Sequence, residues 1–371
     1  MQIYFYKVFN LIIEFRLPNN EALNKAFLEQ FSLYKDIQNA KPNIIVEILE
    51  QPLVIEKGMR NPSIQNDFKN GFCMTTYDGH INFEKEDEFL YIKAYIKFEK
   101  SFLIKFFKKI IDWEYTSREE KIGQTIFERI LVPATFFYSN YFPVHSSAFL
   151  SPDNKVIIIG GTGGVGKTSL GIEYCLNRNY KFLCDDMAIL NSEGILFPNY
   201  SFPKIYGYNL VDNEKMNKIV FSKRSIFDRI SWTIRIRIFG GSKVRRKINP
   251  QKVYKIPKSN YFPVHSFFIL TREYRNDFSI EVLNYERAAQ MNINVIKTEY
   301  SKFISHIYWH MFNRQANQDH FIIDYDSLIR SWETTGLQAL SKVKCYLIKV
   351  PIKIKHKDFI LKLSNLIENA V

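Results

Sequence analysis

The chain has 371 residues, enough for two domains, and 46% of them are hydrophobic, so it can bury a large core. No apolar run is long enough for a membrane-spanning helix, and the opening residues lack the basic start of a signal peptide. The four cysteines are scattered without a C-x-x-C pair, which excludes a disulfide framework or a zinc finger. We therefore expect a cytoplasmic protein without a membrane span.

Residues 1–118 predict a separate α+β module. Alternating or apolar runs at 3–15, 43–49, 72–76 and 89–98 are typical of strands. Asp78-Gly79 stands between two of these runs and predicts a hairpin. The apolar spacing over 20–34 predicts a helix. No chemical motif occurs in this module, and its role stays open.

A basic amphipathic stretch at 102–113 lies near the end of the module. It is typical of a surface helix that covers its own core, but it also fits contact with a membrane surface or a partner. Residues 119–371 form the second predicted domain, and 121–142 predict a helix leading into it. Pro133 marks a kink or a boundary in that helix. Farther along we expect strands at 266–270, 278–283 and 345–350, and helices at 286–296, 299–313 and 357–370.

The strongest motif of the chain lies within residues 155–186. An apolar β-branched run at 156–159 predicts a strand, a glycine-rich turn follows, and a helix-compatible segment comes next. Residues 161–168 fit G-x-x-x-x-G-K-[ST], the phosphate-binding loop. Its glycines let backbone N–H groups face phosphate oxygens, and the helix that follows adds the positive end of its dipole. The predicted nucleotide-binding residues are Gly161, Thr162, Gly163, Gly164, Val165, Gly166, Lys167, Thr168 and Ser169.

The chemistry of this loop predicts a nucleotide and Mg²⁺ and leaves the identity of the nucleotide open. Lys167 can reach the β- and γ-phosphates, and the Thr168 hydroxyl can ligate Mg²⁺. Asp185 and Asp186 end the next apolar run, 17 residues after Thr168. A phosphoryl-transfer site needs one carboxylate at the metal and another as base, and this pair can supply both. We place Thr168 and Asp186 at the metal and leave open which aspartate is the base.

Residues 212–258 form a lid-like basic segment. Between 215 and 258 there are fourteen Lys or Arg and one acid, Asp228, so this stretch has the same net charge, +13, as the whole chain. It can be a solvated surface or a patch for nucleotide phosphates or an acidic substrate. No nucleic-acid-binding module accompanies it, so nucleic acid is not the expected partner. Arg245 and Arg246 follow a glycine hinge, and an arginine on a mobile loop can stabilise a phosphoryl group in transfer.

Three histidines are candidates for chemistry. His145 begins the strand before the phosphate-loop strand, where it can orient a carboxylate or relay a proton. His306 and His310 are four residues apart and share a helix face, a spacing that can bind metal. No Glu or Cys completes that site, so we expect a packed or surface pair.

Together these motifs resemble the HPr kinase/phosphorylase superfamily, in particular its stand-alone HPr-kinase-like serine kinase branch. The strand at 144–148 is similar to the family's His-containing strand, 160–168 to its phosphate loop, and 183–186 to its two-aspartate strand. Weaker similarities lie at 203–205, Arg246 and 249–250. The chain lacks the Leu-Glu-x-Arg-Gly stretch and the N-terminal domain of true HPr kinases, which puts HPr itself in doubt as the substrate.

The resemblance implies an α/β fold with a P-loop core like that of phosphoenolpyruvate carboxykinase, built on a mixed sheet with flanking helices. It implies that one of Asp185 and Asp186 is the base for a serine hydroxyl and that His145 supports the pair. We expect an ATP- and Mg²⁺-dependent kinase acting on a hydroxyl of a peptide, protein or small molecule. The alternative is an ATP-binding switch or assembly protein whose segment 215–258 binds an acidic partner. The oligomeric state stays open.

Overall fold

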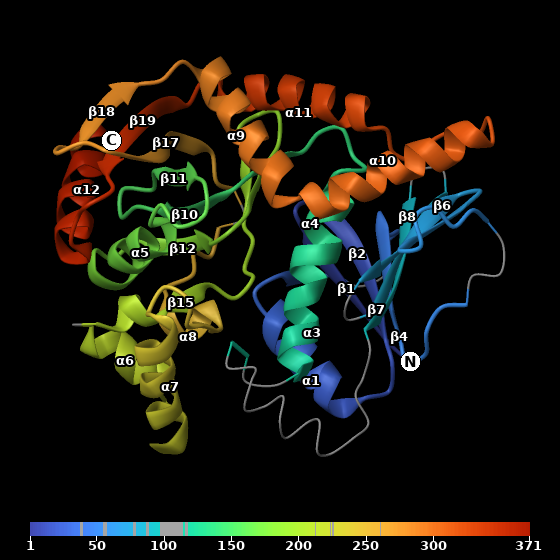
Figure 1. Ribbon diagram of the computed structural model, residues 1–371, viewed down its shortest axis with the longest axis horizontal. Helices are drawn as coiled ribbons and strands as arrows, with labels where there is room; N and C mark the ends of the chain where they lie inside the picture. The colour runs from blue at the N-terminus through green and yellow to red at the C-terminus, as the bar shows by residue number, and fades with distance from the viewer. Residues whose placement is uncertain are drawn as a thin grey trace. The chain divides into compact units, whose positions relative to one another are not determined.

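The computed structural model describes residues 1–37, 40–54, 58–76, 79–86, 89–96, 114–115, 118–211, 213–222, 224, 226–259 and 261–371. The chain is mixed α/β and forms two compact units (Figure 1). The first unit comprises Met1–Phe106, Arg118–Phe142 and Ile293–Thr335. The second comprises Phe107–Ser117, Pro143–Asn292 and Gly336–Val371. The amphipathic stretch at 102–113 lies outside the described residues.

The two units are interleaved along the chain, whereas the sequence analysis placed a single boundary after residue 118. The segment that was expected to lead into the nucleotide domain packs in the first unit instead. Its Phe127 stacks on Phe31 at a ring-centroid distance of 4.7 Å, so its apolar face is buried against an N-terminal helix. The sequence does not reveal that this later segment packs with the N-terminal unit, because the contacts that hold it there join residues far apart in the chain.

The first unit is built on an eight-stranded sheet in the order β3-β1-β2-β4-β8-β7-β6-β5. Its strands are β1 (Gln2–Val8), β2 (Leu11–Leu17), β3 (Lys35–Asp36), β4 (Ile44–Leu49), β5 (Gln65–Phe68), β6 (Gly71–Thr76), β7 (Gly79–Glu86) and β8 (Phe89–Ile96). Its helical elements are α1 (Glu21–Phe31), α3 (Arg118–Ile126), the π-helical turn η1 (Phe127–Leu131), α4 (Val132–Thr135) and α10 (Ser301–Ala316). The helices α9 (Tyr285–Glu299) and α11 (Tyr325–Leu340) contribute residues to both units.

Local sequence signals explain several of these elements. The side chain of Asn20 accepts a hydrogen bond from the backbone N–H of Leu23 and caps α1, which confirms the helix predicted over 20–34. The strands β6 and β7 pair antiparallel with Thr76 opposite Gly79, as expected of a hairpin, although Asp78 itself lies outside the described residues. Pro133 is the second residue of the short helix α4, which follows η1 directly. The expected single helix over 121–142 is therefore divided into α3, η1 and α4 and ends at Thr135.

His306 and His310 lie on α10 and attach it to β5. His306 Nδ1 is 2.7 Å from Gln65 Oε1, and His310 Nδ1 is hydrogen-bonded to Asp67 Oδ1. Both histidines are buried. Within the described part of the chain, no group of three His, Cys, Asp or Glu residues could hold a metal ion. The two histidines are therefore a packed pair.

The second unit is built on a six-stranded mixed sheet in the order β12-β10-β11-β17-β19-β18. Parallel pairing joins β11, β17 and β19, and the other pairs are antiparallel. The strands are β10 (Ser146–Leu150), β11 (Val156–Gly161), β12 (Lys181–Cys184), β17 (Val264–Glu273), β18 (Ser279–Val282) and β19 (Lys344–Pro351). Smaller sheets contain β9 (Phe142–Val144), β13 (Ala188–Leu190), β14 (Leu196–Phe197), β15 (Lys204–Tyr206) and β16 (Arg245–Lys247).

Helices accompany this sheet. They are α5 (Lys167–Ile172), the π-helical turn η2 (Glu173–Asn177), the 3₁₀ turn η3 (Gly207–Leu210), α6 (Glu214–Val220), α7 (Ile226–Phe239), α8 (Pro250–Val253) and α12 (His356–Ala370). The C-terminal α12 packs beside α5 and η2, and the Tyr174 hydroxyl donates a hydrogen bond of 3.0 Å to the carbonyl of Ser364 (Figure 1). None of the described helices has both the length and the apolar character needed to cross a membrane.

Candidate functional site

The predicted phosphate loop connects the central strand β11 to α5. Every residue of β11 is buried, as its β-branched apolar run requires of a strand with neighbours on both sides. In the turn that follows, Gly161, Gly164 and Gly166 have φ angles of +126°, +77° and +107°, which side chains rarely tolerate. A Cβ atom on Gly166 would also lie 2.3 Å from the ring of Phe359. The glycines of the motif are thus required by the backbone path.

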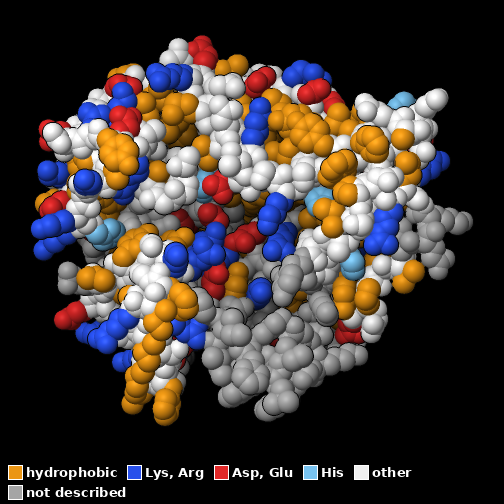
Figure 2. Space-filling model, in the orientation of Figure 1, with side chains coloured by type: hydrophobic (Ala, Val, Ile, Leu, Met, Phe, Trp, Pro, Cys, Tyr) orange, Lys and Arg blue, Asp and Glu red, His pale blue; other side chains and the backbone are white. Residues whose placement is uncertain are grey.

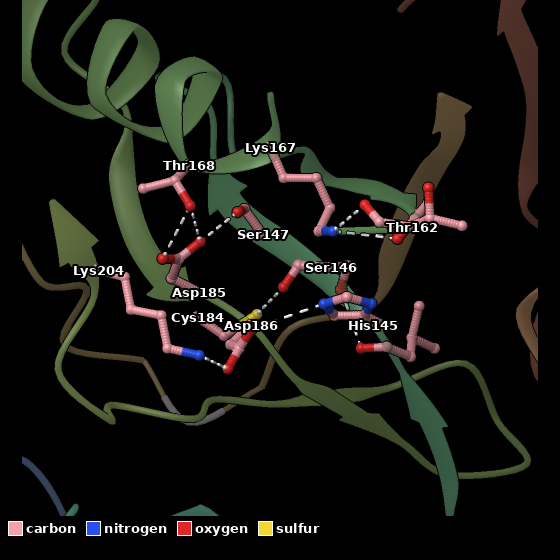
Figure 3. A network of polar contacts seen from close by, with 12 residues as sticks. His145, Ser146, Ser147, Thr162, Lys167, Thr168, Cys184, Asp185, Asp186 and Lys204 are labelled. Atoms are coloured by element: carbon pink, nitrogen blue, oxygen red, sulfur yellow. Dashed lines mark hydrogen bonds and ion pairs between the residues drawn. The ribbon is translucent and has the colours of Figure 1, made fainter. Parts of the chain in front are cut away.

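Lys167 is folded back over this loop. Its side chain is buried, and Nζ donates hydrogen bonds to the carbonyls of Gly161 (3.0 Å) and Thr162 (2.9 Å), as Figure 3 shows. The ammonium group is therefore held at the centre of the loop by weak, neutral acceptors. A phosphate oxygen would be a stronger partner for the same charge.

Asp185 lies directly after β12 and faces the start of α5. The Thr168 hydroxyl donates to both of its carboxylate oxygens, at 3.1 and 3.2 Å, and the Ser147 hydroxyl donates to Oδ1 (Figure 3). Burial raises the pKa of Asp185 above its ordinary value, although the Ser147 hydrogen bond opposes that shift. This carboxylate and the Thr168 hydroxyl form one cluster of oxygen atoms beside the loop.

Asp186 has a different environment. Its Oδ2 accepts a hydrogen bond of 2.6 Å from Lys204 Nζ, and its Oδ1 is 3.5 Å from His145 Nε2 (Figure 3). Burial alone would raise the pKa of Asp186, but Lys204 and His145 hold it well below its ordinary value. The side chain is 38% exposed, whereas Asp185 is almost fully buried. The backbone of Asp186 has a φ of +81°, a sparsely populated conformation that turns the two neighbouring aspartates in different directions.

These groups line one cavity of about 490 Å³ in the second unit. The loop, both aspartates and His145 form part of its wall, so the structure brings together His145, both aspartates and most of the loop residues predicted at 161–169. Gly161, Thr162 and Val165 are not among the lining residues. The remaining lining residues are Lys204, Tyr206, Tyr208, Ser242, Arg272, His356 and Phe359. Three cations from separate elements therefore stand with the two carboxylates around a cavity large enough for a small phosphorylated ligand.

Arg245 and Arg246 are not among the residues that line this cavity. The guanidinium of Arg246 is buried, donates hydrogen bonds of 3.0 and 2.9 Å to Asp228, and lies 4.9 Å from the ring of Trp232. Arg245 Nε donates to Glu114 Oε1 at 3.1 Å. Ser242, which follows the predicted hinge glycines Gly240 and Gly241, does line the cavity.

Arg272, unlike those two arginines, lines the cavity that the phosphate loop also lines. It lies near the carboxyl end of β17, which runs parallel to β11, and its guanidinium is 4.8 Å from the ring of Phe359. The carboxyl ends of parallel strands meet at one edge of a sheet, where α/β proteins bind ligands. That rule could have identified Arg272 from the apolar run at 266–270. Lys204 lies in the segment 203–205, whose weak similarity to the resembled family gave it no role.

Comparison with known proteins adds little to this geometry. No family model matches the chain, and no curated protein matches it. Among solved structures, the Hpr(Ser) kinase/phosphatase from Coxiella burnetii is similar over 62% of this chain and 95% of its own, with a TM-score of 0.25 and 13% sequence identity. At that TM-score the similarity carries no argument about fold or function.

Proposed function

We propose that the chain is an ATP- and Mg²⁺-dependent kinase that transfers the γ-phosphoryl group of ATP to a hydroxyl of a peptide, protein or small molecule. The observation that carries the proposal is the difference between two adjacent carboxylates beside a phosphate-binding loop. Asp185 is buried against Thr168, whereas Asp186 is exposed to the cavity and is flanked by Lys204 and His145. A phosphoryl-transfer site needs both kinds of carboxylate.

The loop supplies the phosphate site. Its left-handed glycines leave backbone N–H groups free to face an anion, and Lys167 can exchange two neutral carbonyl partners for phosphate oxygens. Lys204 and Arg272 add positive charge at the cavity wall. We infer that Arg272, rather than Arg245 or Arg246, stabilises the charge of the phosphoryl group during transfer.

The oxygen cluster of Thr168 and Asp185 fits Mg²⁺. A hydroxyl and a carboxylate are ligands that Mg²⁺ prefers, and the ion takes its remaining ligands from water and phosphates. Asp185, rather than the Asp186 expected from the sequence, therefore holds the metal, because Thr168 contacts Asp185. Held by Thr168 and Asp185, Mg²⁺ would offset the negative charge of the phosphates.

Asp186 then serves as the base. Its lowered pKa keeps the carboxylate ionised at neutral pH, so it can accept the proton of the acceptor hydroxyl. The acceptor oxygen forms a bond to the γ-phosphorus, the bond from that phosphorus to the bridging oxygen breaks, and ADP leaves. His145 and Lys204 orient the carboxylate by contacting its two different oxygens.

Incubation of the purified chain with γ-labelled ATP, Mg²⁺ and cell extract tests the proposal. We expect a labelled acceptor with the wild-type chain and none with Lys167→Ala, while the surface variant Lys218→Ala labels normally. ATP binding without label transfer would support the alternative, an ATP-dependent switch whose basic segment 215–258 binds an acidic partner. Absence of ATP binding would contradict both functions.

A further inference from the structure

The helix α7 exposes an apolar stripe on the side that faces away from its own core. The residues Ile226, Ile230, Ile234 and Ile238 are spaced four apart and therefore share one helix face, and Phe227 lies beside them. Their exposed fractions are 74%, 51%, 49% and 67% for the isoleucines and 83% for Phe227. Figure 2 shows this stripe as a ridge of hydrophobic side chains over α7, at the lower left. We call these five residues the α7 ridge.

The opposite face of α7 is firmly attached to the second unit. Trp232 is buried and packs edge-to-face on Phe221, and the guanidinium of Arg246 lies against the Trp232 ring while it pairs with Asp228. Residues two apart in a helix point in nearly opposite directions, so the burial of Trp232 directs Ile230 and Ile234 outward. The α7 ridge is thus held outward by an anchored helix, and it is apolar where a surface helix is normally polar.

Charge limits what can cover this ridge. The segment 215–258, which contains α7, carries one acid against fourteen Lys or Arg, of which Arg246 and Lys247 are buried and Arg245 pairs with Glu114. Arg229 and Arg237 are exposed on α7 itself. A second copy would bring the same basic segment against the first, so like charges would oppose self-association through this face. The occupant must present negative charge and accept apolar side chains.

An anionic lipid surface meets both requirements without a complementary groove. Helices that lie in the membrane interface combine exposed Phe and aliphatic residues with arginines, and basic residues near an anionic leaflet strengthen the attachment. A helix of 14 residues presents a ridge about 20 Å long, which can enter the boundary between headgroups and acyl chains. We propose that α7 is a peripheral membrane-binding helix that attaches the second unit to anionic lipid.

Vesicle sedimentation with the purified full chain tests this assignment. The probes are vesicles of phosphatidylcholine alone and vesicles with 30% phosphatidylglycerol, because the two differ only in surface charge. We expect binding to the anionic vesicles that weakens as salt rises, and at least tenfold weaker binding to the neutral ones. A chain that binds neither vesicle, or binds both equally, overturns the proposal, and failure on both would leave an acidic protein as the occupant of the ridge.

Matched variants connect the binding to the ridge. Ile230→Gln combined with Ile234→Gln should weaken binding to the anionic vesicles by at least about tenfold, because two apolar side chains no longer enter the lipid. Arg229→Gln combined with Arg237→Gln should flatten the salt dependence. Val282→Gln removes an apolar side chain that is 83% exposed on β18 and should change neither. Thermal unfolding verifies that each variant is folded; equal binding by wild type and the Ile230→Gln/Ile234→Gln variant would overturn the assignment to α7.

Discussion

The Nζ atom of Lys204 lies 2.6 Å from Asp186 Oδ2, and this contact makes the two adjacent aspartates chemically different. At Asp185 burial raises the pKa, although the Ser147 hydrogen bond and the charges of Lys204 and Lys167 oppose that shift, and its oxygens also accept hydrogen bonds from Thr168. The pKa of Asp186 is held low by Lys204 together with His145. Asp185 is thus a buried carboxylate beside the Thr168 hydroxyl, whereas Asp186 is a carboxylate that stays ionised in an open cavity.

Replacement of Lys204 should shift the pH dependence of the reaction. In Lys204→Met the pKa of Asp186 should rise. The charge of Lys204 is the strongest influence that lowers this pKa against the effect of burial, and the substitution removes it. A base must be ionised to act, so the acidic limb of the rate profile should move to higher pH. The measurement is the rate of phosphoryl transfer or ATP hydrolysis from pH 5 to 9, with Lys218→Met as the control. An unchanged acidic limb would show that Lys204 does not influence the pKa of the base.

Asp185→Asn should weaken the response to Mg²⁺. Asparagine has nearly the same shape and can still accept hydrogen bonds from Thr168 and Ser147, but it lacks the negative charge that holds a divalent ion. We expect the Mg²⁺ concentration for half-maximal activity to rise at least tenfold, while ATP binding measured without Mg²⁺ changes little. Asp277→Asn replaces an exposed aspartate elsewhere in the second unit and is the control. Equal Mg²⁺ dependence in all three proteins would remove Asp185 from the metal site.

Gly164→Ala and Gly166→Ala form a matched pair in the phosphate loop. Both residues have positive φ, so each alanine should cost about 1–2 kcal/mol of folding stability through backbone strain. Only at position 166 does the added Cβ meet the ring of Phe359, at 2.3 Å, whereas at Gly164 no atom lies within 4 Å. Urea unfolding should therefore show the larger loss for Gly166→Ala. A larger loss for Gly164→Ala would contradict this loop geometry.

The first unit should lose stability as the pH falls from about 6.5 to about 4. Burial lowers the pKa of His306 to about 4, so this side chain resists protonation in the folded state. Its contribution is fully present above the unfolded pKa of about 6.5 and is lost as the pH approaches the folded value, by up to about 3 kcal/mol. Urea unfolding across this range should show a shallower slope for His306→Leu than for wild type. The exposed His320→Leu should keep the wild-type slope; if it flattens the slope equally, His306 is not the cause.

Sequence patterns identified those parts of the site whose geometry is set by residues adjacent in the chain. The glycines at 161, 164 and 166 and the aspartates after β12 act through their immediate neighbours, so their pattern is visible in one stretch of chain. The sequence patterns gave no role to Lys204 or Arg272, and the convergence of these two side chains on one cavity depends on the pairing of distant strands. The same reason explains the domain boundary: Phe127 packs on Phe31, a contact between segments nearly a hundred residues apart.

Arg246 is a residue for which the sequence pattern suggested a wrong environment. Its position after a glycine hinge in a basic segment is typical of a mobile arginine, yet its guanidinium is buried between Asp228 and Trp232. Charge counts cannot distinguish an exposed arginine from one that stabilises a helix, because the distinction depends on a single acid that pairs with it. That pairing fixes α7 and thereby exposes the α7 ridge.

The most direct test of the proposed kinase is one set of samples in which ATP binding and label transfer are both measured for wild type and Asp186→Asn. If Asp186 is the base, the variant should bind ATP within about threefold of wild type, because its side chain contacts Lys204 and His145, which lie outside the phosphate loop. Transfer should fall at least a hundredfold. Transfer by Asp186→Asn at the wild-type rate would contradict the account.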